Sequence, residues 1–273
     1  NRMVKLLTRL NGTGESLYDL KLHLIENCIY GIDIQPIATQ ISKLRFFISL
    51  ICESNRKDTE ENFGLPTLPN LETKFVAANS LLAKKEQERQ GDLFDKREIE
   101  KNRDKLLNVR HQLFSARKAS DKKKLRAIDK ELREKLADLL AENCFCDEKQ
   151  AKQLAAWNPY DQNASAAFFD TEWMFGMKDG FDIVIGNPPY IQLQNDGGKL
   201  ADLYKGCGFE TFARMGDIYC LFYERGMQLL KDRGSLCYIT SNKWMRAGYG
   251  EATRNFFANK TNPKLLIDFA GEK

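Results

Sequence analysis

The chain has 273 residues, 42% of them hydrophobic and 29% charged, which suits one sizeable core with room for a second small domain. No apolar run approaches the ~20 residues that cross a bilayer, and no secretory signal opens the sequence, so we expect a cytoplasmic protein without a membrane partner. Seven scattered cysteines, an odd number, favour reduced thiols over a disulfide framework. Two histidines exclude a His-rich metal site, and we predict no metal; the oligomeric state stays open.

The net charge of +4 is unevenly distributed along the chain. Residues 84–135 contain 18 lysines and arginines against 11 acids, an excess of seven positive charges, which leaves the remainder at −3. Such a stretch could follow the phosphates of a nucleic acid. It could equally form a solvated helical hairpin or a docking surface for another domain of the same protein. The acids mixed throughout the stretch slightly favour the second interpretation.

The first part of the chain predicts two strands with a helix between them. Residues 27–34, NCIYGIDI, form a short β-rich run that includes Asp33 at its end. Residues 35–51, QPIATQISKLRFFISLI, predict a helix, because Pro36 suits a first turn and apolar residues recur at helical spacing. These apolar positions are Ile37, Ile41, Leu44 and Ile48. After a loop punctuated by proline and glycine, residues 73–82 predict a second strand that breaks at Asn79.

Residues 84–142 change to a charged composition with regularly spaced leucines, which predicts two antiparallel helices in a coiled arm. One apolar stripe is formed by Ile99, Leu106, Val109 and Leu113, and the other by Leu125, Ile128, Leu132, Leu136 and Leu139. The sequence KASDK at residues 118–122 predicts the turn between the helices, with Ser120 as the N-cap of the second.

The last part of the chain again alternates strands and helices. It contains an apolar strand at residues 181–186, an amphipathic helix at 218–231, a strand at 234–242 and a last strand at 263–271. Buried strands that alternate with amphipathic helices predict an α/β fold, a doubly wound and mostly parallel sheet with helices on both faces. In such sheets ligands bind at the carboxyl ends of the strands.

Polar residues close the first two predicted strands. The Asp33 carboxylate could accept hydrogen bonds from the two vicinal hydroxyls of a ribose, as acids do in nucleotide-binding α/β folds. A turn or N-cap acid is at least as good an explanation of Asp33 taken alone. Asn79, followed by Ser80, is a weak signal by itself, because asparagine commonly ends strands.

Asn187, Pro188, Pro189 and Tyr190 follow the third strand directly. An exocyclic amine on a planar base is a poor nucleophile, because its lone pair is delocalised into the ring. Acceptor oxygens from the Asn187 side chain and the Pro188 carbonyl would favour a tetrahedral nitrogen and aim its lone pair at an electrophile. The prolines stiffen this backbone, and Tyr190 offers a flat face for stacking. We weigh a simple strand end well below this cradle for an aromatic amine.

At these residues the chain resembles the amino-group DNA methyltransferases that use S-adenosylmethionine and modify adenine. NPPY is similar to their catalytic motif, which implies catalytic roles for Asn187, Pro188, Pro189 and Tyr190. IYGIDI is similar to their strand that ends in the ribose-binding acid, and residues 217–244 match the helix and strand after the catalytic loop. The resemblance thereby implies a cofactor site formed by Asp33, Ile34, Asn79, Ser80, Leu81, Asp217 and Tyr219.

Longer stretches, at residues 33–50 and 164–192, resemble the fused type IIG restriction–modification proteins and related phage-defence methylases. The resemblance implies that residues 1–83 and 143–273 are two parts of one methyltransferase domain, and that residues 84–142 are a basic helical-hairpin insertion. It implies double-stranded DNA as the partner, with restriction endonuclease activity elsewhere in the full protein.

The family's Gly-rich loop, which holds the methionine part of the cofactor after the first strand, has no counterpart here. The glycines of NGTGES, residues 11–16, follow no predicted strand. We therefore expect an incomplete Rossmann-like fold, a fragment of the methylase region whose own cofactor binding is weak or absent. The target-recognition domain is also expected outside this sequence.

The resemblance implies a mechanism in which adenine is extruded from duplex DNA and its amine attacks the sulfonium methyl directly. Alternatives stay open. An NPPY cradle also serves methylation of a protein glutamine amide or of RNA bases, and the chain could be a catalytically silent DNA-binding fragment. A nicotinamide dehydrogenase built around Asp33 would lack its Gly-x-Gly-x-x-Gly loop.

Overall fold

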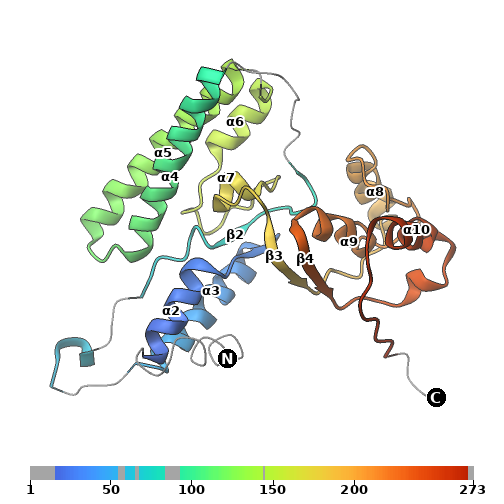
Figure 1. Ribbon diagram of the computed structural model, residues 1–273, viewed down its shortest axis with the longest axis horizontal. Helices are drawn as coiled ribbons and strands as arrows, with labels where there is room; N and C mark the ends of the chain where they lie inside the picture. The colour runs from blue at the N-terminus through green and yellow to red at the C-terminus, as the bar shows by residue number, and fades with distance from the viewer. Residues whose placement is uncertain (1–15, 55–58, 65–67, 84–92, 144, 270–273) are drawn as a thin grey trace. The chain divides into compact units, whose positions relative to one another are not determined.

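A computed structural model describes residues 16–54, 59–64, 68–83, 93–143 and 145–269 (Figure 1). The glycines of residues 11–14, the first residues of the basic stretch and Gly271 lie outside the described residues. The chain divides into two compact units, Asn1–Gly176 and Met177–Lys273, and each contains a pair of parallel strands. Helices and strands mix in both units, as in an α/β protein. No helix of the described part is long and apolar enough to cross a membrane.

The first element of the described residues is a helix that the sequence pattern did not predict, α2 (Leu17–Asn27). It is capped by the Ser16 hydroxyl, which accepts a hydrogen bond from the backbone N–H of Asp19. The predicted strand of residues 27–34 is shorter in the structure, where Asn27 belongs to α2 and β1 is only Gly31–Asp33. β1 runs parallel to β2 (Phe75–Ala77). Their carboxyl ends are therefore adjacent, with Asp33 opposite Ala77.

Helix α3 (Pro36–Ile51) forms where it is predicted, with Pro36 in its first turn. Its inner face contributes Phe46, Phe47 and Leu50 to a core that also includes Phe75 of β2. The predicted apolar stripe lies on the other face and remains exposed. Its exposed fractions are 63% for Ile37, 51% for Ile41, 56% for Leu44 and 51% for Ile48.

Two long helices, α4 (Leu93–Ser115) and α5 (Ala119–Glu142), pack along each other, and α6 (Glu148–Ala156) packs on α5 (Figure 1). The prediction that Ser120 caps the second helix is wrong. Lys118 has the extended conformation of the N-cap, and Ser120 lies inside the helix, where its hydroxyl contacts the Asp121 carboxylate.

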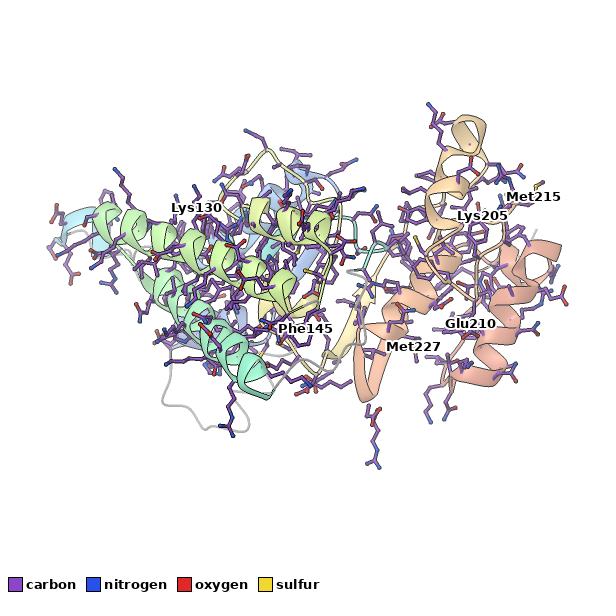
Figure 2. The ribbon with its side chains drawn as sticks, turned by 90° about the horizontal axis from the view of Figure 1, so that it is seen from above. Lys130, Phe145, Lys205, Glu210, Met215 and Met227 are labelled. Carbon is purple, nitrogen blue, oxygen red and sulfur yellow. The ribbon has the colours of Figure 1, made fainter. Side chains whose placement is uncertain are left out.

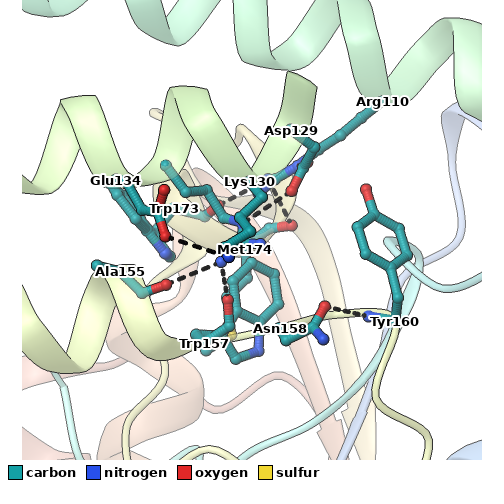
Figure 3. Close-up of polar contacts among 11 residues, drawn as sticks. Arg110, Asp129, Lys130, Glu134, Ala155, Trp157, Asn158, Tyr160, Trp173 and Met174 are labelled. Carbon is teal, nitrogen blue, oxygen red and sulfur yellow. Dashed lines mark hydrogen bonds and ion pairs between the residues drawn. The ribbon is translucent and has the colours of Figure 1, made fainter. Parts of the chain in front are cut away.

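The interior of this helical region is partly ionic (Figure 3). The fully buried Asp129 carboxylate accepts hydrogen bonds from Arg110 Nε at 2.9 Å and Arg133 Nε at 2.7 Å. Arg110 also donates to the backbone carbonyl of Trp173, and Arg133 donates to that of Trp157. The two arginines thus tie α4 and α5 to the segments that follow α6, because each satisfies carbonyl groups there.

The second unit is built on β3 (Phe181–Gly186) and β4 (Leu230–Tyr238), which run parallel and are connected through α9 (Tyr219–Gln228). The predicted boundaries of this helix and the second strand, at residue 231 and residues 234–242, are wrong. Phe181 pairs with Leu230, and after a register shift Ile183 pairs with Ser235. β4 therefore begins at Leu230, within the range predicted as helix, and ends at Tyr238.

Only one face of this strand pair is covered by α9. Gly226 allows the close approach, because a Cβ atom there would lie 2.7 Å from atoms of Leu236 and Tyr238. The opposite face stays open: Ile183 is 65% exposed and Ile185 75% exposed.

The predicted last strand is wrong over its described residues 263–269, which form neither helix nor strand. Leu265 and Phe269 are about four-fifths exposed, at 79% and 80%. No strand of the described residues pairs with this segment, and an extended segment needs such a partner to form a ladder. The remaining short elements are η1 (Glu61–Gly64), α7 (Thr171–Phe175), η2 (Asn195–Gly198), α8 (Lys199–Tyr204), η3 (Lys243–Met245), η4 (Gly248–Gly250) and α10 (Glu251–Lys260).

Candidate functional site

Asp33 ends β1 with an exposed carboxylate, and Ile34 beside it is 58% exposed. Asp33 Oδ1 accepts a hydrogen bond from the backbone N–H of Gln35 at 2.8 Å, just before α3 begins. This carboxylate therefore serves as the turn acid that the sequence left as an alternative. Its remaining acceptor capacity, beside an exposed apolar side chain, still suits a ribose with an adjoining flat ring.

The end of β2 lies next to the end of β1, because the Ala78 N–H donates to the Asp33 carbonyl at 2.9 Å. Asn79 and Ser80 are half-buried there, and Asn79 Oδ1 accepts a hydrogen bond from the Leu81 N–H at 3.1 Å. Leu81 is only 2% exposed, so its side chain belongs to the core. Of the three predicted residues at this end, Asn79 and Ser80 are the ones with side chains near the surface.

In the second unit, the predicted catalytic residues directly follow β3. Pro188 is buried, whereas Asn187, Pro189 and Tyr190 are exposed, and Tyr190 has an exposed fraction of 55%. The Tyr190 hydroxyl donates to Asn187 Oδ1 at 3.2 Å and lies 3.4 Å from the Ile239 carbonyl oxygen just after β4. This contact orients the Asn187 amide with its oxygen toward Tyr190. One lone pair of that oxygen remains for another donor.

Asp217 and Tyr219 lie at the start of α9, and both are buried, at 6% and 0% exposed. The chain after the catalytic residues returns to this point, since Gln192 and Asp217 form an antiparallel bridge. The Tyr219 ring packs edge-on against the Tyr190 ring, with 6.0 Å between the centroids. Asp217 and Tyr219 thereby belong to the same local structure as the predicted catalytic residues.

A residue that the sequence reasoning missed joins these two side chains. The Tyr249 hydroxyl in η4 donates to Asp217 Oδ2 at 2.7 Å and lies 3.1 Å from the Tyr219 hydroxyl. Tyr249 has no local signal, because its link to Asp217 spans 32 residues and arises only from folding.

Both phenols carry their proton near neutral pH, as tyrosines ordinarily do, and burial strengthens this. Burial raises the pKa of Tyr249 to about 12, and the pKa of Tyr219 is also raised, first by burial and then by the hydrogen bond to Tyr249. Each phenol has one hydrogen, and Tyr249 uses its own on the carboxylate. Tyr219 must therefore donate to Tyr249, which gives a directed chain from Tyr219 through Tyr249 to Asp217.

Asp217 keeps one carboxylate oxygen available to a ligand. Among the described residues no group donates to Asp217 Oδ1, and the residue as a whole is 6% exposed. An acceptor of this kind fits the hydroxyl, amine or ammonium donors of a nucleoside–amino acid ligand. The described part of the chain contains no group of three or more His, Cys, Asp or Glu residues that could hold a metal ion.

Comparisons with known proteins match most of the chain. The family described as Eco57I restriction-modification methylase matches residues 27–273. The type II restriction enzyme and methyltransferase RM.Eco57I of Escherichia coli is 22% identical over 261 residues, 94% of this chain and 18% of the relative. The adenine-specific methyltransferase BrxX of Escherichia coli O9:H4 is 26% identical over 262 residues, 89% of this chain and 20% of the relative.

Another relative matches a shorter part of the chain with a higher sequence identity. The type II methyltransferase M.PaeR7I of Pseudomonas aeruginosa is 33% identical over 88 residues, 32% of this chain and 15% of the relative. The chain thus spans a fifth or less of the length of these three relatives. No solved structure matches the chain.

Proposed function

This chain belongs to the Eco57I restriction-modification methylase family, and from that premise we propose that it carries the methyl-transfer centre of an adenine-specific DNA methyltransferase. The substrate is the exocyclic amine of adenine in double-stranded DNA, and the methyl donor is S-adenosylmethionine. The protein works in the cytoplasm within a restriction–modification or phage-defence system. The full-length protein also contains a restriction endonuclease outside this sequence.

The observation that carries the proposal is the loop at the end of β3, where Asn187 and Tyr190 are exposed and bonded to each other. The target adenine is turned out of the duplex, because its amine cannot be reached within the base stack. Asn187 Oδ1 and the Pro188 carbonyl oxygen accept the two amine hydrogens and orient the nitrogen lone pair. Tyr190 moves from Asn187 to stack on the base, and Pro189 limits the motion of the loop.

S-adenosylmethionine supplies an electrophilic sulfonium methyl group. In the first unit, Asp33 would bind the ribose hydroxyls, and Ile34 and Asn79 would contact the adenine of the cofactor. In the second unit, Asp217 and Tyr219 are the residues that would bind it. No enzyme nucleophile would be required, since the amine would attack the methyl group directly, with the N–C bond forming as the S–C bond breaks and a neutral thioether leaving. Asn187 and Pro188 prepare the nitrogen, and the amine proton would pass to solvent after transfer.

The same proposal accounts for the apolar faces that the two units leave open. We propose a doubly wound, mostly parallel α/β fold for the methyltransferase domain, in which Ile183 and Ile185 are covered by further helices. In that fold residues 84–142 are an insertion between the two parts of the methyltransferase domain, 1–83 and 143–273.

The test is methyl transfer by the full-length protein carrying Asn187→Ala, with radiolabelled S-adenosylmethionine and duplex DNA, RNA or protein as acceptors. Loss of one preorganised polar contact to the reacting group costs about 10²-fold or more in turnover. Asn195→Ala is the matched control, because this exposed asparagine lies in the same loop region outside the cradle. A wild-type rate for Asn187→Ala would refute the mechanism, and methylation of RNA or protein alone would refute the substrate.

A further inference from the structure

Half-buried Tyr249 makes a polar contact with buried Asp217 that the proposed reaction leaves unexplained. It comes from the short turn η4 before α10, outside the catalytic loop and outside α9. Its hydroxyl is nevertheless the one group in the described residues that donates to the Asp217 side chain, at 2.7 Å. It also accepts the hydrogen bond from Tyr219, whose ring touches Tyr190.

The surrounding structure holds Tyr249 in this place. Its ring lies against Gly216, where a Cβ atom would meet the ring at 3.4 Å and the Ala213 carbonyl oxygen at 3.0 Å. Arg254 of α10 donates to the backbone carbonyls of Trp244 and Ala247, at 2.6 and 3.0 Å, and so fixes the turn that leads into η4. Contacts with Gly216 and with the fixed turn before η4 restrict the Tyr249 side chain. It is therefore suited to orient another group, because little further side-chain entropy is lost when its hydroxyl forms a hydrogen bond.

We propose that Tyr249 is a positioning residue, which holds the Asp217 carboxylate and the Tyr219 ring in the orientation that receives S-adenosylmethionine. This inference rests on the proposed function. The hydrogen bond from Tyr249 engages Asp217 Oδ2 and fixes the rotation of the carboxylate. Oδ1 then has one orientation, in which it can accept a hydrogen bond from S-adenosylmethionine. Without the hydrogen bond from Tyr249, a buried carboxylate would have no donor from the described residues and would turn toward water.

The first test is direct binding of S-adenosylmethionine to the full-length protein, measured by calorimetry. Tyr249→Phe removes only the hydroxyl and keeps the ring against Gly216. We expect the dissociation constant and the KM for S-adenosylmethionine to rise about tenfold, while kcat changes less than threefold, since a lost hydrogen bond to a charged group corresponds to about 1.5 kcal/mol. Equal binding by wild type and Tyr249→Phe would overturn the inference.

Tyr223→Phe is the matched control. Tyr223 belongs to the same aromatic cluster and loses a hydroxyl contact to Thr240, but it does not touch Asp217. Its binding constant should remain that of the wild type. If both variants weaken binding equally, the hydroxyls act only through general packing, and the positioning role is refuted.

The second test asks whether Tyr249 acts through Asp217. In a double-mutant cycle with Asp217→Asn, the effect of Tyr249→Phe on binding should fall to less than twofold, because the group that it orients has lost its charge. Independent, multiplying effects would overturn the inference. A wild-type protein that neither binds S-adenosylmethionine nor methylates DNA would instead refute the proposed function, so the two failures are distinguishable.

Discussion

The helix pair α4–α5 and helix α3 place their predicted apolar stripes in opposite ways. Ile99, Leu106 and Leu113 of α4 are buried, whereas the stripe of α3 is exposed. In the helix pair, the buried interior includes Asp129 with its two arginines. In α3, Lys43 is buried, at 8% exposed, while the stripe that contains Ile41 faces outward. Both helices have apolar residues at helical spacing, so the spacing establishes the helix without establishing which face is covered.

The two regions differ in whether the side chains concerned find their partners among nearby residues. The Asp129 carboxylate is paired locally, because both of its oxygens accept arginine N–H groups within the first unit, although Arg110 Nη2 is buried without a hydrogen-bond partner among the described residues. The apolar side chains of the α3 stripe and of the open face of β3–β4 are not covered by other described residues. An exposed isoleucine forgoes roughly 1.5–3 kcal/mol of burial, and such faces are typical of surfaces that another layer covers. The proposed doubly wound sheet provides that layer.

The largest effect is expected from Asp129→Asn, which tests the ionic side of the comparison. The substitution keeps the shape but leaves Arg110 and Arg133 without a counter-charge in a buried site. We expect the free energy of unfolding, measured in urea, to fall by about 3 kcal/mol or more. Lys130→Ala is the control, since Lys130 is 68% exposed (Figure 2) and should change this free energy by less than about 0.5 kcal/mol. Equal effects would show that the cluster contributes nothing specific.

A smaller effect is expected from Ile41→Lys, which tests the apolar side. If the α3 stripe is covered in the full-length protein, the free energy of unfolding should fall by about 2 kcal/mol, the burial lost with one isoleucine. Arg45→Ala, at an exposed polar position of the same helix, should remain within about 0.5 kcal/mol of the wild type. Ile41→Lys with wild-type stability would contradict the proposed layer.

The smallest effect concerns Lys74, a half-buried cation that lies against Tyr30 instead of a carboxylate. Its ammonium group donates to the Tyr30 hydroxyl at 3.3 Å and lies 4.4 Å from the ring centroid. Burial lowers the pKa of Lys74 to about 8. Below pH 8 the folded protein bears the whole cost of this buried charge. Between pH 8 and about 10.4 the unfolded chain binds more protons, so the cost disappears and stability rises with pH.

Lys74→Met should therefore raise the free energy of unfolding at pH 7 by about 1 kcal/mol, after the lost ring contact is subtracted. It should also flatten the rise between pH 8 and 10 in urea unfolding curves. Lys21→Met is the matched control, because Lys21 is paired with Glu53 at 2.6 Å and its loss should lower stability. An unchanged pH dependence in Lys74→Met would show that the charge carries no such cost.

The sequence alone determined those features that depend on neighbouring residues. Pro36 and the apolar spacing after it predicted α3, and the apolar run 181–186 before two prolines predicted β3 with its polar end. Asn187 to Tyr190 could be singled out because a strand end, two prolines and an aromatic ring are all local signals. Their catalytic and cofactor roles stay predictions that the experiments above address.

Tertiary structure alone decided the rest, because the forces involved act between distant residues. Asp129 is buried only because arginines from both long helices meet it, and the last predicted strand fails over residues 263–269 because no described strand pairs with it. Tyr249 reaches Asp217 across 32 residues, a contact that no spacing encodes. Local preference selects helices and strands, whereas burial and hydrogen-bond pairing depend on what the folded chain brings together.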